Sequence, residues 1–168
     1  MVISIDYTVA PKAKYPHIFE ENFKAYKKIV ENSESLFGFK IVKLALAGDS
    51  CGGHFCLDIA KNAIKHGVRK PDGLLLIYPS TRIVFENMGP SFGISCRDSF
   101  IEMSLMGNMQ KAVLDLENFD LDHYDKDENL NFYKTPKEII SNFPKTYIIL
   151  ASNDPLKDES FILADFLL

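Results

Sequence analysis

The chain has 168 residues, of which 46% are hydrophobic and 25% are charged. This length and composition are typical of one globular domain with a buried core, and they exclude a disordered or fibrous chain. The net charge is −4 at pH 7, so nothing favours nucleic acid or an anionic membrane surface as a partner. The apolar runs are strand-sized, far below the ~20 residues that a membrane-spanning helix needs, so no transmembrane segment is expected.

The N-terminal residues and the cysteines bear on where the protein works. Residues 1–11 have neither a basic region nor a long apolar stretch, so they do not resemble a signal peptide. Cys51, Cys56 and Cys96 form an odd and sparse set, which favours reduced thiols and a cytoplasmic location. The first two are too isolated to indicate a zinc site, and we expect neither a metal nor an organic cofactor.

The first predicted elements are a strand, a helix and a second strand. Residues 2–9 are rich in β-branched and aromatic side chains, and Pro11 ends that run. Apolar residues at helical spacing predict a helix from about Pro16, with Gly38 as its C-cap. The apolar residues at 41–47 predict the second strand.

The later elements continue the alternation. A second helix runs to about His66 and is ended by Gly67; predicted strands follow at 73–78 and 145–151, and the start of a last helix at 159–168. Alternating strands and helices predict an α/β fold, a mostly parallel sheet with helices on both faces.

Residues 80–143 break this alternation and predict an insertion in a single domain that spans residues 1–168. Within it, residues 115–128 carry seven acidic residues against one lysine. The acidic run favours a solvated helix face or loop, and the insertion as a whole favours a lid or cap over a site.

Both ends of the chain predict an incomplete fold. Met1 is followed directly by a predicted core strand, and the last helix stops on Phe166, Leu167 and Leu168 without a glycine or polar cap. We therefore expect a fragment or a shortened gene model. A sheet with exposed edges would gain from pairing, so a homodimer is one expectation.

The sequence Gly48-Asp49-Ser50-Cys51-Gly52 is the chain's main chemical motif, and Gly53 follows it. An apolar strand precedes it and an amphipathic helix follows, which is the setting of a nucleophile elbow. Glycines at 48 and 52 would let strand and helix come close, and the strained turn would expose the Ser50 hydroxyl. The alternative is a glycine-rich turn with an incidental serine.

An elbow at this position predicts an oxyanion site. Ser50 would lie at a helix N-terminus, whose partial positive charge favours a developing oxyanion. The backbone N–H of Cys51 would supply one hydrogen-bond donor.

A nucleophilic serine also needs a base and an orienting carboxylate. Asp154 follows the strand at 145–151, at the same edge of the sheet as Ser50, whereas a turn aspartate is the other interpretation of N-D-P. Asp158 is a weaker candidate for the acid. Of the four histidines, His66 lies at the wrong end of the helix and His54 is expected to pack beneath the sheet; His17 starts a helix and His123 lies in the acidic run.

These motifs together resemble the hormone-sensitive-lipase family of α/β-hydrolases. VISIDYTVAP at 2–11 is similar to that family's D-Y-x-L-A-P strand, GDSCGG at 48–53 to its G-D-S-A-G-G elbow, and NDPLKDE at 153–159 to its D-P-L-x-D-E acid motif. Cys51 stands where the family usually has alanine. The resemblance carries the triad acid onto Asp154.

The resemblance implies a serine hydrolase that cleaves a small carboxylic ester or lipid, an acylglycerol or sterol ester among them, through an acyl-enzyme on Ser50. It also implies that the family's H-G-G-G segment precedes Met1 and that the catalytic histidine follows Leu168, so this chain alone is expected to turn over little substrate. The alternative is a ligand-binding module similar to the plant gibberellin receptors, which keep the fold and lose the histidine.

Overall fold

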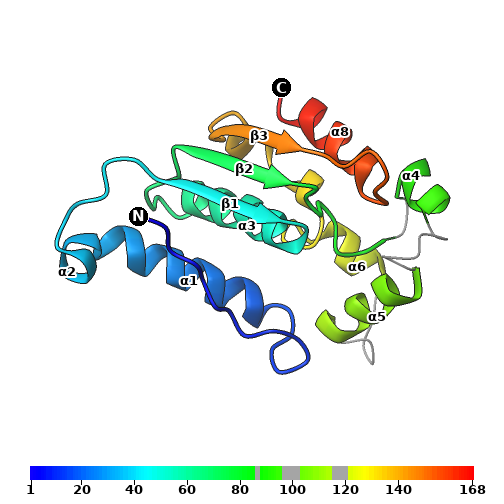
Figure 1. Cartoon of the computed structure of the whole chain (residues 1–168), viewed down its shortest axis with the longest axis horizontal. Helices are drawn as coiled ribbons and strands as arrows, with labels where there is room; N and C mark the ends of the chain where they lie inside the picture. Colours follow the sequence, from blue (N-terminus) through cyan, green and yellow to red (C-terminus); the bar gives the residue numbers. More distant parts are fainter. Residues whose placement is uncertain (86–87, 96–102, 115–120) are drawn as a thin grey trace.

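The computed structural model describes residues 1–85, 88–95, 103–114 and 121–168, and shows a parallel three-stranded sheet backed by helices (Figure 1). The strands are β1 (Ala45–Asp49), β2 (Gly73–Ile77) and β3 (Lys145–Ile149), and they lie in the order β1-β2-β3. All pairs are parallel. The prediction of a parallel α/β fold is confirmed.

The helices are those that the sequence predicts, with additional short ones between β2 and β3. Their bounds are α1 His17–Glu31, α2 Ser33–Phe37, α3 Cys51–Lys65, α4 Pro90–Ile94, α5 Met103–Val113, α6 Leu121–Lys126, the 3-10 helix η3 Phe132–Lys134, α7 Lys137–Ile140 and α8 Lys157–Phe166. The helix expected from Pro16 to Gly38 is interrupted at Asn32, and Gly38 caps α2 in the left-handed conformation, with φ 77°. Over the described ranges, no helix combines the length and the apolar character that crossing a membrane requires.

The core lies between the sheet and α3. Leu74 and Leu76 of β2 are almost fully buried against Leu57 and Ala60 of α3, and Leu163 of α8 joins the same cluster. Residues that alternate along a strand point to opposite faces, so these two leucines define one face of the sheet. Residues of α1 pack on α3 and on β1 at the same side.

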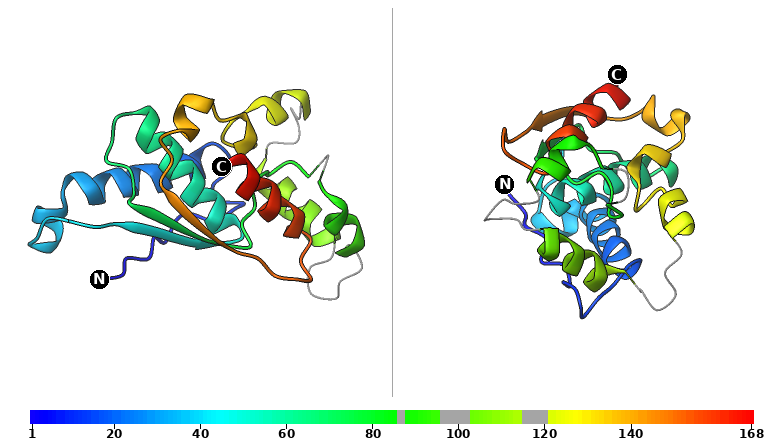
Figure 2. Two further views of the ribbon diagram at one scale, coloured as in Figure 1. Left: turned by 90° about the horizontal axis from the view of Figure 1, so that it is seen from above. Right: turned by 90° about the vertical axis from the view of Figure 1, so that its right-hand side faces the viewer.

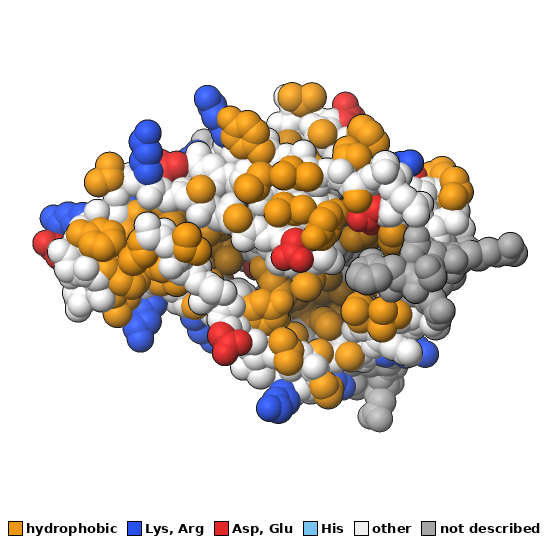
Figure 3. Space-filling view, viewed as in Figure 1, with side chains coloured by type: hydrophobic (Ala, Val, Ile, Leu, Met, Phe, Trp, Pro, Cys, Tyr) orange, Lys and Arg blue, Asp and Glu red, His pale blue; other side chains and the backbone are white. Residues whose placement is uncertain are grey.

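The opposite face of the sheet carries no helix among the described residues. Leu75 points to this side, together with Tyr147 and Ile149, which are 69% and 51% exposed. Ala47, Leu75 and Tyr147 pair across the three strands, so the exposed residues form a row. Figure 2 shows the helices on one side of the sheet, and Figure 3 shows hydrophobic side chains gathered on the other.

The strand predicted at residues 2–9 is wrong, because no described residue of this segment pairs with the sheet. It runs as an irregular tube past β1 (Figure 1), and Val2 is 95% exposed. The backbone N–H of Thr8 donates to Glu21 Oε2 of α1, at 2.8 Å, instead of to a neighbouring strand. A groove of about 590 Å³ is lined on one side by Met1, Val2, Ile3 and Ile5, and on the other by residues 43–47, which lead into and form β1.

The predicted insertion at 80–143 divides into two parts. Phe132, Ile140 and Phe143 pack against the core under α3, so the end of the segment belongs to the body of the fold. Residues 86–87, 96–102 and 115–120 lie outside the described residues, and with them Cys96 and much of the acidic run. The role of a lid stays a prediction.

Candidate active site

Ser50 occupies the turn between β1, which ends at Asp49, and α3, which begins at Cys51. Its backbone has φ 51° and ψ −118°, a region that non-glycine residues rarely adopt. Strain of this kind persists only where the surrounding structure fixes it, and it concentrates at functional positions. The turn therefore has the geometry of a nucleophile elbow.

Hydrogen bonds from the neighbouring strand hold the strained residue. The Ser50 N–H donates to the carbonyl of Ile77 at 3.0 Å, which continues the ladder between β1 and β2. The Ser50 carbonyl accepts from the N–H groups of Gly53 at 3.1 Å and Ser80 at 3.0 Å. Ser80 follows β2, so the ends of two parallel strands fix the elbow together.

Two glycines of the motif are required by contact distances. A Cβ on Gly48 would lie 2.3 Å from the backbone carbon of Gly52, and one on Gly53 would lie 2.7 Å from Cβ of Pro79. The expectation for Gly52 was wrong, because a Cβ there would meet nothing nearer than Asp49 Oδ1 at 3.9 Å. The close contacts are therefore at Gly48, whose Cα faces the backbone of Gly52, and at Gly53, whose Cα faces Pro79.

The N-terminus of α3 provides the electrostatic part of the site. This helix has 15 residues, and its dipole places partial positive charge at the turn. Within the described residues, the N–H of Cys51 and the hydroxyl of Ser50 have no hydrogen-bond partner. The Cys51 N–H lies at the helix N-terminus, beside the half-buried Ser50 hydroxyl. It can therefore donate to the oxyanion that forms when such a hydroxyl attacks a carbonyl group.

The residue next to Ser50 is an exposed free thiol. Cys51 Sγ lies 3.9 Å from the hydroxyl of Tyr7, which belongs to the segment that was expected to be a strand. Burial, followed by the nearby Cys51 and Asp49, raises the pKa of Tyr7 to about 12. The Tyr7 hydroxyl therefore keeps its proton at neutral pH and cannot serve as a base.

Asp154 lies in the loop between β3 and α8, at the carboxyl end of the sheet where Ser50 also lies. Because β1 and β3 are both parallel to β2, the two residues share this edge. The carboxylate is half-buried, and its Oδ1 accepts from the N–H of Leu156 at 2.7 Å. Asp158 is committed elsewhere: its Oδ2 accepts from the N–H of Ser91 at 2.7 Å.

None of the described histidine side chains forms a hydrogen bond with the Ser50 hydroxyl. His54 is 2% exposed, and its ring nitrogens lie 3.1 Å from the carbonyl of Ser80 and 2.6 Å from that of Asn129. Burial lowers the pKa of His54. Both of its ring nitrogens face carbonyls of two loops, so neither is left to accept a proton from Ser50. His66 caps the far end of α3 against Phe23.

The other two histidines contribute no candidate base. His17 is exposed at the first residue of α1. The side chain of His123 lies outside the described residues. Among the residues that the structure describes, no cluster of three or more histidine, cysteine or acidic side chains could hold a metal ion.

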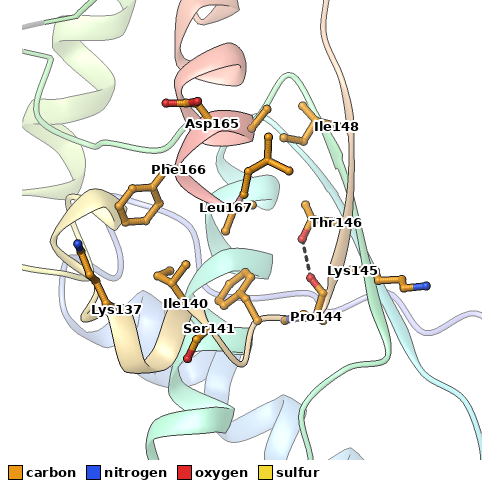
Figure 4. A pocket seen from close by; sticks show the side chains of 13 residues that line it. Lys137, Ile140, Ser141, Pro144, Lys145, Thr146, Ile148, Asp165, Phe166 and Leu167 are labelled. Carbon is orange, nitrogen blue, oxygen red and sulfur yellow. Dashed lines mark hydrogen bonds between the residues drawn. The ribbon is translucent and has the colours of Figure 1, made fainter.

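One cavity lies away from this site. It measures about 1050 Å³ and opens between the start of β3, α7 and the end of α8, where Figure 4 shows Phe166 and Leu167 beside Ile140 and Ile148. It lies at the amino ends of the strands, whereas ligands of open α/β sheets bind at the carboxyl ends. We therefore assign the site to the elbow and not to this cavity.

Comparison with known proteins identifies the class. A family described as the alpha/beta hydrolase fold matches residues 1–167, and the chain belongs to it. Over 127 residues it is 35% identical to hormone-sensitive lipase of Mus musculus, and over 170 residues it is 27% identical to esterase LipI of Mycobacterium tuberculosis. The resemblance to the hormone-sensitive-lipase family is thereby confirmed.

Solved structures agree with this assignment. An alpha/beta hydrolase enzyme from the metagenome of Lake Arreo, Spain, superposes with a TM-score of 0.85 at 29% identity over 98% of the chain. The hyperthermophilic esterase of the archaeon Pyrobaculum calidifontis superposes with a TM-score of 0.83 at 26% identity. The chain spans 49% and 51% of these two structures, and 16% of the mouse lipase.

Three features of the site were missed from the sequence. The contact of Gly53 with Pro79, the hydrogen bond of Ser80 to Ser50, and the attachment of Ser91 to the loop of Asp154 all join residues far apart in the chain. Local patterns do not report such contacts, and only the order of the strands in the sheet could have indicated the first two.

Proposed function

We propose that this chain contributes the nucleophile and the acid of a serine hydrolase that cleaves carboxylic esters. Ser50 attacks the ester carbonyl, the alcohol leaves with a proton, and water then releases the acid from the acyl-enzyme. Asp154 is the residue that orients the general base, and the N–H of Cys51 is one donor to the oxyanion. The strained φ of Ser50, at a helix N-terminus with an unoccupied amide donor, is the observation that carries the proposal.

The substrate class follows from the relatives. Proteins named hormone-sensitive lipase and esterase are similar to this chain over most of its length. We infer a small ester or a lipid ester as substrate, with acylglycerols and sterol esters as the lipid candidates and no cofactor. We further infer a cytoplasmic protein.

The general base is not among the described contacts of Ser50, so the nucleophile can be tested by supplying a base from outside. A fluorophosphonate probe should label the chain slowly, and added imidazole should raise the rate of labelling by at least about tenfold, because general-base catalysis contributes factors of that size or larger. Mass spectrometry of the peptide that contains Ser50 locates the label.

The matched control is Ser50→Ala, which should show no labelling with or without imidazole. Equal labelling of Ser50→Ala and of the unchanged chain would refute the assignment of Ser50 as the nucleophile. Rapid labelling without imidazole would show instead that this chain supplies its own base.

A ligand-binding module without turnover is the second candidate, and it is favoured because the carbonyls of Ser80 and Asn129 engage both ring nitrogens of His54 and leave none to serve Ser50. This candidate predicts that imidazole raises the labelling of Ser50 but brings about no hydrolysis of p-nitrophenyl esters, because such a module keeps the serine and loses turnover.

A further inference from the structure

The peptide group between Pro155 and Leu156 is held at both of its polar atoms. Its N–H, from Leu156, donates to Asp154 Oδ1 at 2.7 Å. Its carbonyl, from Pro155, accepts from Ser91 Oγ at 3.0 Å. A peptide group is planar, so a side chain that fixes the carbonyl also fixes the direction of the N–H. Ser91 is thus connected through one rigid unit to the carboxylate of Asp154.

Ser91 is itself fixed by a second pair of hydrogen bonds. Its N–H, in the first turn of α4, donates to Asp158 Oδ2 at 2.7 Å, and its Oγ accepts from the N–H of Asp158 at 3.2 Å. A hydroxyl has one donor and two acceptor positions, so the bond to Asp158 leaves its proton for Pro155. Ser91 is 5% exposed, and water competes little for these bonds.

The fit between the two segments is close. Gly89, the N-cap of α4, lies so near α8 that a Cβ on it would be 2.6 Å from Cβ of Asp158. A side chain at position 89 would therefore displace the first turn of α4, and Ser91 with it. The charged acceptor makes the bond from the Ser91 N–H stronger than a neutral one.

We propose that Ser91 is a positioning residue for Asp154: its hydroxyl sets the Pro155–Leu156 peptide, and this peptide sets the carboxylate. The proposal rests on the role of Asp154 as the triad acid. Asp158, the weaker candidate for the acid in the sequence, instead holds Ser91 through two hydrogen bonds.

The test follows the amide of Leu156 by NMR in the 168-residue chain. An N–H that donates to a carboxylate changes its chemical shift as that carboxyl ionises, so a pH titration of the Leu156 resonance reports the bond to Asp154. In Ser91→Ala the amplitude should fall to about half or less, and the amide should exchange with solvent about fivefold faster, as expected for a lost hydrogen bond of ordinary strength.

Two further variants separate the hydroxyl from the packing. Ser91→Cys keeps the volume and offers only a weak S–H donor, so it should behave like Ser91→Ala, and it serves if the alanine variant does not fold. Ser91→Thr keeps the hydroxyl and should restore the amplitude. Ser95→Ala, a buried serine at the other end of α4, is the matched control and should leave Leu156 unchanged.

An unchanged titration amplitude and exchange rate in Ser91→Ala or Ser91→Cys would overturn the proposal. This readout needs no ester hydrolysis. If Ser91→Ala loses the Leu156 response but Ser50 is not labelled by the fluorophosphonate, the positioning role stands and the proposed hydrolase is refuted. If Ser50 is labelled but Ser91→Ala keeps the Leu156 response, the hydrolase stands and the positioning role is refuted.

Discussion

The glycines of the elbow differ in what they do, although the sequence presents them as equivalent. Gly48 faces the backbone of Gly52 so closely that no side chain can enter, whereas a Cβ on Gly52 would make only an ordinary van der Waals contact, with Asp49 Oδ1 at 3.9 Å. The G-x-S-x-G pattern therefore combines one position that must be glycine with one that has room for a methyl group.

Substitution of these two glycines should give opposite results. Gly48→Ala should lower the free energy of unfolding by about 3 kcal/mol, because the new methyl group overlaps a backbone that cannot move without breaking the elbow. Gly52→Ala should be neutral or raise stability by up to about 1 kcal/mol, since alanine is the better helix former in the first turn of α3. Urea unfolding of both variants gives the comparison, and equal losses would show that the contact distances do not control the turn.

At the scale of elements, α3 is tied to the rest of the fold by buried polar groups as well as by its apolar face. His54 contacts the carbonyls of Ser80 and Asn129, and Lys61 Nζ lies 2.9 Å from Asp58 Oδ1 and 2.5 Å from Asn129 Oδ1. Buried groups of this kind require partners, so they fix the helix against two loops in one register.

His54 gives the chain a predictable dependence on pH. Burial holds its folded pKa below the unfolded value of about 6.5, so its contribution is fully present above that pH and is lost as the pH falls. Stability should decline as the pH falls below about 6.5, with a slope of at most about 1.4 kcal/mol per pH unit from this group.

Urea unfolding across this range checks the slope. His54→Gln should remove its part of the slope, whereas His66→Gln, at the exposed end of the same helix, should retain it. The same slope in His54→Gln and in the unchanged chain would contradict the assignment.

Much of the fold could be predicted from element patterns, and the errors have physical causes. The apolar runs of β2 and β3 are buried or paired along their length, so their patterns located them within a residue or two. The strand expected at 41–47 begins later, at Ala45, because the Arg69 guanidinium binds the carbonyls of Ile41 and Val42 in place of a neighbouring strand. The Arg69 side chain thus takes the place of the backbone hydrogen bonds of a neighbouring strand, and no local sequence pattern predicts such a contact.

The site could be predicted in part. Ser50 and Asp154 follow strands at one edge of a parallel sheet, and their positions depend only on strand order. Ser91 lies in a segment with no periodic pattern, 64 residues before Pro155, so its contact depends on tertiary packing alone. The candidate residues were therefore accessible from the sequence, and the residue that positions one of them was not.

At the scale of the whole molecule, and over the part of the chain that the structure describes, the sheet has one face covered by helices and one open face. Tyr147 and Ile149 on β3 and Leu75 on β2 are exposed together, and β1 and β3 are both edge strands. Contiguous apolar surface beside unpaired backbone is a template for association with another chain.

We therefore expect the isolated chain to self-associate through this face, in line with the homodimer suggested by its sequence. The double variant Tyr147→Lys/Ile149→Lys should stay monomeric in sedimentation velocity at concentrations where the unchanged chain does not. Phe161→Lys, an equally exposed apolar residue on α8, is the control and should not change the oligomeric state. Association that persists in the double variant would place the contact elsewhere.

The two described cysteines have one further consequence, which concerns how the site can be observed. Cys56 is buried, and burial raises the pKa of its thiol to about 12, whereas Cys51 is exposed in the residue after Ser50. A thiol-directed fluorophore on a Cys96→Ser background would attach at Cys51, the residue next to Ser50. The replacement of alanine by cysteine in this elbow thus supplies a native attachment point for an optical reporter of ligand arrival.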